Sequence, residues 1–474
     1  MGLSPGARMK TYDVGVIGGG PAGYVAAIRA AQLGLRTCLV EKEWLGGVCL
    51  NVGCIPSKAL LRNAELVYLV RERAAEFGLY MDNLRLDYSI AVRRSRQVAA
   101  RLTKGVAYLM QKNGIEVYLS TARLTGRTAE GQVRVALADG TELTVQHLIL
   151  ATGASPVVPS GWEVDGRQVL TYRQAILQET LPARAVIIGG GAIGVEFATI
   201  WNAYGVAVTV VEMMPHLLPN EDEEAAAELG KAFKKRGIKV LEGTRVEALE
   251  REGELVRVRV TSARGTQVLE ADQVLLAMGF RPTTAGLGLE TLGVPLDERG
   301  AVVIDERMAT PVPGVWAIGD VTGKLMLAHV GSAMGIVAAE AIAGVETVKL
   351  DYTAMPRAVY SFPQVASFGL TEAQARARGY PVKTARFPFQ ANGKALGLGE
   401  PMGWVKLVVD EHYGELLGAT LVGPEVTELL PELTLAHMME LTPAEIARNV
   451  HAHPTLAEAL MEAAHGAEGH GIHL

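Results

Sequence analysis

The sequence predicts an α/β protein with two dinucleotide-binding units and a C-terminal α+β domain. Two observations support this prediction: a strand, glycine turn and helix motif occurs twice, and a different strand and helix pattern comes after the second copy. The chain has 474 residues, of which 49% are hydrophobic, so it can fill several cores at about 150 residues per domain. Its 53 glycines suit a fold with tight turns between strands and helices.

The repeated motif begins with an apolar run that ends in a G-x-G-x-x-G turn. A helical pattern and a second apolar run come next, and that run closes on an acid 18 residues after the last glycine. The motif residues are Gly18, Gly20, Gly23 and Glu41 in the first copy, and Gly189, Gly191, Gly194 and Glu212 in the second. Such glycines let the backbone lie against a pyrophosphate at a helix N-terminus, and the acid binds a ribose. Close packing can produce one such motif, but two matching copies predict two Rossmann-like sites.

Later glycines end further strands, at 146–153, 272–279 and 314–320. The pattern of strands that end in glycine turns stops after Asp351. Strands such as 404–409 then precede helical stretches such as 425–440, so we expect a different final domain to start there. Residues 1–8 show no periodic pattern, and we expect them to form a disordered extension.

Charge and cysteine content narrow the functional class. The 45 basic and 51 acidic residues give a net charge of −6 without long runs of one sign, which argues against nucleic-acid or membrane partners. The sequence contains no 18-residue apolar run and no secretory signal pattern. Three cysteines cannot form the disulfide framework of a secreted protein, so we expect a cytoplasmic protein.

Two of the cysteines, Cys49 and Cys54, lie five residues apart in a glycine loop that enters a helix. A helix N-terminus favours the thiolate, so this pair predicts redox chemistry through a disulfide. A cysteine pair is also half of a zinc site, but further ligands are missing and we expect no metal. Cys38 lies in an apolar run and is interpreted as a small buried residue.

A candidate proton acceptor lies near the C-terminus, where His453 precedes a proline and Glu458 lies shortly after it. A dithiol enzyme must deprotonate a thiol near neutral pH, and an imidazole with a pKa near 6.5 that a carboxylate orients suits this task. His451 is a competing candidate that the sequence does not exclude.

These elements, in this order, resemble the flavoprotein disulfide reductases over about residues 9–465. The resemblance implies an FAD-binding domain at 9–153, an inserted NAD-binding domain at 154–278, and a segment at 279–351 that completes the FAD site. It also implies that residues 352–474 form the interface of a homodimer.

The resemblance also assigns the cofactor-binding residues. The first glycine motif with Glu41 would hold FAD, and the second with Glu212 would hold NAD. Glu212-Met-Met lacks the basic residues that bind the 2′-phosphate of NADP, which favours NAD. The other implied cofactor-binding residues are Lys58, Ala151, Thr152, Gly153, Gly279, Gly319, Asp320, Met326, Leu327 and Ala328.

In the implied mechanism, Cys49 exchanges with the substrate and Cys54 faces the flavin. The partner subunit's His453, oriented by Glu458, would accept the substrate proton. Lys58 would stabilise the reduced flavin, with Glu196 as its ion-pair partner.

Within this family, Cys-Ile-Pro-Ser-Lys58 and His-Pro-Thr-Leu-Ala-Glu458 are similar to the branch that oxidises dihydrolipoamide with NAD⁺. Glutathione reductase relatives usually have a basic residue at the position of Ser57. Mercuric and large thioredoxin reductases add a C-terminal redox pair, and this chain has no cysteine after Cys54. The implied substrate is free dihydrolipoamide or the lipoyl group of a 2-oxo acid dehydrogenase or glycine-cleavage complex. Alternatives are a reductase for another disulfide, an NADH oxidase, a transhydrogenase or a docking subunit. Residues 331–335 depart from the acidic stretch of many members.

Overall fold

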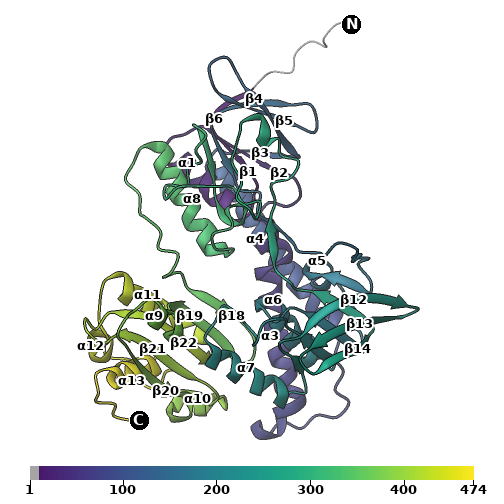
Figure 1. The fold of residues 1–474 in the computed structure, drawn as a ribbon, viewed down its shortest axis with the longest axis vertical. Coiled ribbons are helices and arrows are strands. Elements are labelled where there is room, and N and C mark those ends of the chain that lie inside the picture. Colours follow the sequence, from purple (N-terminus) through teal and green to yellow (C-terminus); the bar gives the residue numbers. More distant parts are fainter. Residues whose placement is uncertain (1–9, 474) are drawn as a thin grey trace. The chain divides into compact units, whose positions relative to one another are not determined.

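The structure is a computed structural model that describes residues 10–473, and the extension predicted at residues 1–8 lies outside them. The chain forms two compact units, each assembled from three stretches (Figure 1). The first unit comprises the described residues through Ala59, together with 92–157 and 279–352; the second comprises 60–91, 158–278 and 353–473.

The predicted five-part division remains a prediction, and the compact units differ from it at residues 60–91. These residues were expected in the first nucleotide domain but belong to the second unit. Their contacts there are extensive: the Tyr68 ring lies 3.7 Å from the Arg236 guanidinium, and Arg71 donates to the carbonyl of Ala203 at 2.7 Å.

The first unit contains a seven-stranded sheet in the order β3-β2-β1-β6-β5-β4, with β17 also paired to β6. Its strands are β1 (Lys10–Ile17), β2 (Thr37–Glu41), β3 (Glu116–Leu119), β4 (Ala122–Arg127), β5 (Val133–Leu137), β6 (Glu142–Leu150) and β17 (Val315–Ala317). Strands β1, β6 and β17 are parallel and in register, so their carboxyl ends meet at one edge. That edge is where doubly wound sheets bind nucleotides.

The helices of this unit are α1 (Pro21–Gln32), α2 (Gly47–Val52), α8 (Ala328–Ala343), the start of α3 (Cys54–Tyr68) and most of α4 (Tyr88–Lys112). Strands β7 (Ala154–Pro156) and β16 (Phe280–Pro282) pair antiparallel.

Helices α1 and α8 lie side by side (Figure 1). A Cβ atom at Gly335 would lie 2.6 Å from the carbonyl oxygen of Ala22, and one at Gly331 would lie 3.1 Å from Ala22 Cβ. Gly331 and Gly335 therefore allow this close packing. They lie at the two ends of residues 331–335, the stretch that lacks the acidic residues of many family members.

The second unit contains a parallel sheet in the order β11-β10-β9-β15-β8 and an antiparallel meander of β12, β13 and β14 (Figure 1). The strands are β8 (Val169–Thr171), β9 (Arg184–Ile188), β10 (Ala207–Val211), β11 (Lys239–Leu241), β12 (Arg245–Glu252), β13 (Leu255–Ser262), β14 (Gly265–Ala271) and β15 (Gln273–Leu276). The helices here are α5 (Tyr172–Ala175), α6 (Ala192–Ala203) and α7 (Glu223–Lys235), together with the rest of α3 and the first residues of α4.

The C-terminal part of the second unit, residues 353–473, forms an antiparallel sheet in the order β18-β19-β22-β21-β20. Its strands are β18 (Arg357–Val359), β19 (Gln364–Gly369), β20 (Val382–Pro388), β21 (Trp404–Asp410) and β22 (Leu416–Gly423). Its helices are α9 (Glu372–Ala377), α10 (Gly393–Leu398), α11 (Leu430–Met438), α12 (Pro443–Arg448) and α13 (Glu458–Ala467). Buried side chains of β19 to β22 and of α11 and α13 form one core, which includes Phe387, Leu421 and Leu460.

The predicted fold class is thus confirmed, because two strand, glycine turn and helix units precede an α+β domain. Among residues 10–473, no helix has both the length and the apolar character that a bilayer crossing requires.

Candidate active site

The first glycine turn connects β1 to α1, and close backbone contacts require its glycines. Gly18 has φ +110°, and a Cβ atom there would lie 2.1 Å from the carbonyl oxygen of Ala151. A Cβ atom at Gly23 would lie 1.9 Å from the carbonyl oxygen of Gly18. At Gly20, in contrast, the nearest atom would be Gly47 Cα at 3.9 Å, so this side of the turn has room for a ligand.

Glu41 ends β2 and fixes the shape of this turn. One carboxylate oxygen accepts the N–H of Gly19 at 2.6 Å, and the other accepts the N–H groups of Glu43 at 2.7 Å and Trp44 at 3.2 Å. The acid is buried beside the turn, where a ribose diol could share its remaining lone pairs.

The second glycine turn, between β9 and α6, repeats this geometry. Gly189 has φ +109° and would place a Cβ atom 2.2 Å from the carbonyl oxygen of Ala277, and Gly194 would place one 1.9 Å from that of Gly189. No atom of the described residues lies within 4 Å of a Cβ built at Gly191. Each turn therefore has two glycines required by packing and one that leaves space for a phosphate.

Glu212 is the counterpart of Glu41. It accepts the N–H of Gly190 at 2.6 Å and that of Met214 at 2.7 Å. The next two residues, Met213 and Met214, are exposed, so a nucleotide at this acid would meet thioethers at these two positions. This local chemistry fits NAD better than NADP.

Asp320 lies at the carboxyl edge of the first sheet. Strand β17 leads to it, and the N–H of Ile318 donates to the carbonyl of Leu150 at 2.9 Å. Gly319 has φ +70°, and a Cβ atom there would lie 3.0 Å from Ala22 Cβ, so this segment packs on the start of α1. Burial raises the pKa of Asp320 to about 6. A half-buried carboxyl at this edge fits the hydroxyl-rich part of FAD.

The other predicted cofactor-binding residues near this edge belong to the same unit. The Thr152 hydroxyl donates to the carbonyl of Thr283 at 2.7 Å, and the N–H of Thr283 donates to the carbonyl of Gly153 at 2.9 Å. Gly279 has φ +102° and accepts the N–H of Val157 at 2.9 Å. Met326, Leu327 and Ala328 form the entry to α8. The roles of all these residues remain predictions.

The dithiol lies at the junction of two helices. Cys49 is in α2, and Cys54 is the first residue of α3. A Cβ atom at the intervening Gly53 would lie 2.9 Å from the carbonyl oxygen of Val48, so the tight link requires glycine. Both sulfurs belong to free thiols.

Cys49 and Cys54 are in contact. The hydrogen bond to Cys54 and burial raise the pKa of Cys49, whereas the positive charge of Lys58 lowers it. The two thiols therefore titrate as a coupled pair, in which loss of one proton hinders loss of the second. This contact is what disulfide formation within the pair requires.

Two further residues hold the dithiol loop and were missed in the sequence. The buried Asn51 side chain donates to the carbonyls of Leu45 at 3.1 Å and Gly47 at 2.9 Å. Arg96 of α4 donates to the backbone carbonyl of Asn51. Asn51 could have been suspected as an amide among apolar residues, but no local signal pointed to Arg96.

His453 and Glu458 form the predicted contact. His453 Nδ1 lies 2.9 Å from a carboxylate oxygen of Glu458, and the histidine side chain is 78% exposed. Burial opposes ionisation of Glu458, but the N–H of Thr455 and the His453 ring outweigh it and lower the pKa of Glu458. Because Nδ1 donates to the carboxylate, the exposed Nε2 keeps the lone pair that a base needs.

His451, the competing candidate, has a different environment. Its side chain is 4% exposed, with Nδ1 2.8 Å from the carbonyl of Asn449 and Nε2 3.1 Å from Glu432. Both nitrogens face protein acceptors and the ring is buried, so neither nitrogen is turned toward a substrate proton. This geometry favours His453.

Lys58 and Glu196 belong to different units, so their ion pair remains a prediction. Glu196 is buried in α6 and accepts the N–H of Tyr360 at 3.1 Å. Cys38 is buried, and burial raises its pKa to about 12, in agreement with the interpretation as a small buried residue. In the described part of the chain, no group of three or more His, Cys, Asp or Glu residues is placed to share a metal ion.

Comparison with known proteins agrees with this site. A family model described as pyridine nucleotide-disulphide oxidoreductase matches residues 12–335, and that family's dimerisation domain matches residues 355–464. The dihydrolipoyl dehydrogenase of Mycobacterium leprae is 52% identical over 470 residues, covering 98% of this chain and 100% of the relative. That of Bacillus subtilis is 42% identical over 471 residues, covering 98% and 99%.

Solved structures give a similar result. LpdA from Mycobacterium tuberculosis has a TM-score of 0.89 at 28% identity, covering 97% of this chain and 99% of that chain. The HOCl-induced flavoprotein disulfide reductase RclA from Escherichia coli has a TM-score of 0.84 at 27% identity, covering 96% and 99%.

Proposed function

The chain belongs to the pyridine nucleotide-disulphide oxidoreductase family, and we propose that it oxidises dihydrolipoamide to lipoamide with NAD⁺ as the acceptor. It uses FAD and NAD, as its family does. The contact between Cys49 and Cys54 carries the proposed dithiol chemistry. Identity of 42–52% over nearly the whole chain with relatives named dihydrolipoyl dehydrogenase supports the substrate.

The residues present fit both cofactors. For FAD, we propose the first glycine turn with Glu41, the 151–153 strand end, Asp320 and the entry to α8. For NAD, we propose the second turn with Glu212. When bound, FAD accepts the electron pair of the reduced dithiol and returns it as hydride to NAD⁺.

The dithiol step is a balanced exchange. We assign Cys49 and Cys54 to a disulfide in the oxidised enzyme. A substrate thiolate attacks the sulfur of Cys49, the disulfide bond breaks, and Cys54 leaves as a thiolate. The second substrate thiolate then attacks the substrate sulfur bound to Cys49, the mixed disulfide breaks, Cys49 leaves as a thiolate, and lipoamide is released. The two electrons remain on the enzyme in the reduced cysteine pair.

His453 is the proposed proton acceptor for the substrate thiols. Its exposed Nε2 can approach a dithiol from outside, and Glu458 holds the ring through Nδ1 and stabilises the imidazolium that forms. In a homodimer, the partner subunit's His453 would serve this site. The match to the family's dimerisation domain supports that assembly.

Lys58 is the proposed cation near the dithiol and the reduced flavin, with Glu196 as its partner. It lies four residues beyond Cys54 in α3, and its charge already lowers the pKa of Cys49. The natural substrate is proposed to be a lipoyl group on another protein or free dihydrolipoamide, in the cytoplasm.

An anaerobic titration tests the proposed function. Dihydrolipoamide is added to the FAD-loaded protein, and then NAD⁺, while the visible spectrum is recorded with a Cys54→Ser variant alongside. We expect a long-wavelength band that the variant lacks, and then formation of NADH. A flavin spectrum that dihydrolipoamide leaves unchanged would remove this substrate and favour a reductase for another disulfide, the class to which RclA belongs.

A further inference from the structure

The segment directly after Glu212 supports the second glycine turn. The N–H of Leu218 donates to the carbonyl of Gly190 at 2.9 Å, and a Cβ atom at Gly190 would lie 2.7 Å from Leu217 Cδ2. Both leucines are buried. Leu218 has φ +49°, a left-handed conformation that costs a branched side chain free energy, so surrounding contacts must hold it.

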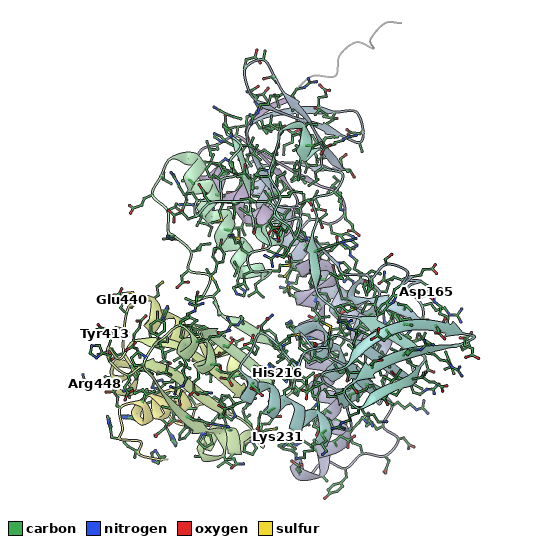
Figure 2. The ribbon with its side chains drawn as sticks, in the orientation of Figure 1. Asp165, His216, Lys231, Tyr413, Glu440 and Arg448 are labelled. Carbon is green, nitrogen blue, oxygen red and sulfur yellow. The ribbon has the colours of Figure 1, made fainter. Side chains whose placement is uncertain are left out.

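Asp222 holds the far end of this segment, where α7 begins. One of its carboxylate oxygens accepts the N–H of Glu224 at 2.9 Å and caps the helix. The N–H of Glu221 donates to the carbonyl of Leu218 at 2.8 Å, which connects the cap to the left-handed residue. Figure 2 labels His216 within this segment and Lys231 on α7.

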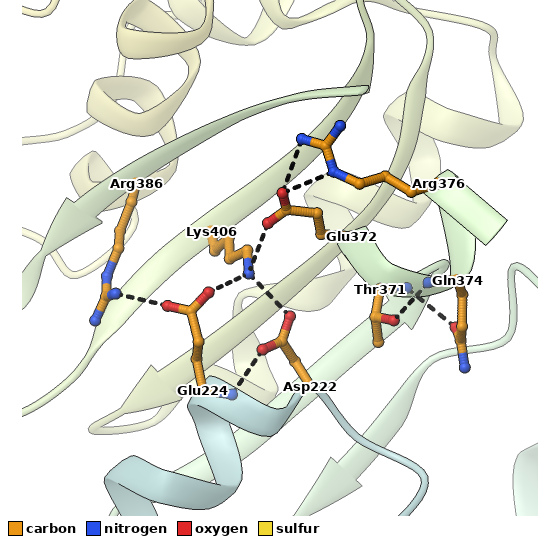
Figure 3. Close-up of polar contacts among 8 residues, drawn as sticks. All are labelled: Asp222, Glu224, Thr371, Glu372, Gln374, Arg376, Arg386 and Lys406. Carbon is orange, nitrogen blue, oxygen red and sulfur yellow. Dashed lines mark hydrogen bonds and ion pairs between the residues drawn. The ribbon is translucent and has the colours of Figure 1, made fainter. Parts of the chain in front are cut away.

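The second carboxylate oxygen of Asp222 accepts a hydrogen bond from Lys406 of β21 at 3.1 Å (Figure 3). The side chains of Lys406 and Asp222 are only 5% and 6% exposed. Lys406 also binds Glu224 at 2.6 Å and Glu372 at 3.4 Å. A cation removed from water and surrounded by three carboxylates is held firmly in place.

The charges around this lysine extend to the surface. Arg386 pairs with Glu224 and Arg376 with Glu372, each at 2.9 Å (Figure 3). Burial lowers the pKa of Lys406, but its carboxylate partners outweigh burial and raise the pKa. The lysine is therefore charged at neutral pH.

A second attachment lies next to the first. The buried Glu221 carboxylate pairs with Arg357 of β18 at 3.2 Å and accepts the hydroxyl of Ser367 of β19. Burial raises the pKa of Glu221, and the charge of Arg357 opposes this shift. The C-terminal sheet thus binds two consecutive acids at the end of the segment that supports the glycine turn.

We propose that Lys406 is a positioning residue for the NAD site. Through Asp222 it fixes the start of α7 and the 217–221 segment, and so the shape of the turn at 189–191. Residues of the C-terminal domain would then determine how well the nucleotide is held. The inference rests on the proposed function only in taking NAD as the ligand of the second turn.

The test compares NADH binding by the FAD-loaded, full-length protein with and without this charge. In Lys406→Met, we expect the Kd for NADH and the KM for NAD⁺ to rise about three- to tenfold, the size of effect typical of coupling between sites. We expect kcat to stay within about twofold, because the substitution should weaken nucleotide binding and leaves the dithiol residues unchanged. Amide hydrogen exchange at 217–221 should become faster, and Lys406→Arg should restore part of the affinity.

Arg376→Met is the matched control, because it removes another cation from Glu372 and leaves the pairing of Lys406 with Asp222 in place. It should leave the NADH Kd unchanged. If Lys406→Met does not fold, Lys406→Met/Asp222→Asn leaves no unpaired charge at the Asp222 position and keeps a side-chain cap, and it should still bind NADH weakly.

An unchanged NADH Kd in the folded variant would overturn the proposal and leave Lys406 a purely structural residue. An equal rise in the Arg376→Met control would also overturn it. NADH binding needs no dithiol substrate, so a wild-type protein that binds NADH but does not oxidise dihydrolipoamide would contradict only the proposed substrate.

Discussion

The two nucleotide-binding regions have nearly the same glycine turn and differ in the segment that the chain enters after the acid. In both, the first glycine has φ near +110° and the last lies against the carbonyl oxygen of the first. In both, the acid accepts a backbone N–H within the turn at 2.6 Å. The turn therefore specifies a dinucleotide cradle without specifying its role.

The role comes from the neighbouring segments. After Glu41, the chain enters the dithiol helices, and Asp320 joins the same unit from far along the sequence. After Glu212, the chain passes through Leu218, which has a left-handed conformation. It then reaches Glu221 and Asp222, which the C-terminal sheet binds. These differences agree with the proposed roles, electron exchange with a dithiol for the first region and binding of NAD for the second.

The largest effect is expected from a substitution in the dithiol, which should stop dithiol oxidation and leave nucleotide binding intact. Cys49→Ser should lower turnover with dihydrolipoamide by about three orders of magnitude or more, because the attacked sulfur is lost. Reduction of an artificial acceptor by NADH should remain, since the second region is intact. Steady-state assays of both reactions on one preparation measure the difference. Equal loss of both would show that the regions do not act separately.

A substitution of the proposed proton acceptor should also lower dithiol oxidation without affecting nucleotide binding. His453→Gln should lower kcat/KM for dihydrolipoamide about a hundredfold or more, the usual contribution of a general base. Glu458→Gln should cost less, because the imidazole remains and loses only its orienting carboxylate. A pH profile of kcat/KM reports whether the fall in activity at low pH, where the imidazole is protonated, disappears with the imidazole. His451→Gln is the control, and a larger loss there would reverse the assignment of the base.

Alanine at equivalent glycines should break the two regions differently. In Gly23→Ala and Gly194→Ala, the added Cβ would lie 1.9 Å from a carbonyl oxygen, so each turn must shift at a cost of about 1–3 kcal/mol. Gly23→Ala should weaken FAD retention, whereas Gly194→Ala should weaken NADH binding and keep FAD. Flavin content after gel filtration and NADH titration measure these effects. Gly191→Ala is the control, because it should fold normally and weaken only the nucleotide.

The smallest expected effect concerns Asp320 in the FAD-free protein. Its pKa rises from 3.8 in the unfolded chain to about 6 in the folded one. The folded state therefore binds this proton more tightly, and the free energy of unfolding falls as the pH rises from about 4 to about 6. Asp320→Asn should remove this loss and raise the free energy of unfolding by about 1–2 kcal/mol at pH 8.

Urea unfolding of the FAD-free protein at pH 5 and pH 8 measures this difference. Asp297 is a control of opposite sign, because backbone N–H groups of Ala301 and Arg299 lower its pKa. Its contribution to stability is lost as the pH falls through its folded pKa. An Asp320→Asn variant with no gain at pH 8 would show that the carboxyl is not penalised by burial.

Sequence spacing alone determined the features that depend on short stretches of chain. Two glycine turns, their acids and the dithiol could be recognised because each is a pattern of residue types at fixed spacing, although carbonyl groups far along the chain also require Gly18 and Gly189. The separation of five residues also placed Glu458 within reach of His453, since both flank the start of one helix. These local rules predicted the fold class and most of the candidate site.

Only the tertiary structure distinguished His453 from His451, because the second ring is engaged by Glu432 of another helix. It alone revealed the hold of Arg96 on the dithiol loop and the pairing of Lys406 with an acid 184 residues away. Local sequence does not encode which distant groups meet, since that depends on how sheets and helices pack. Burial also makes the loss of such a contact strongly destabilising, because a buried charge without a partner costs free energy.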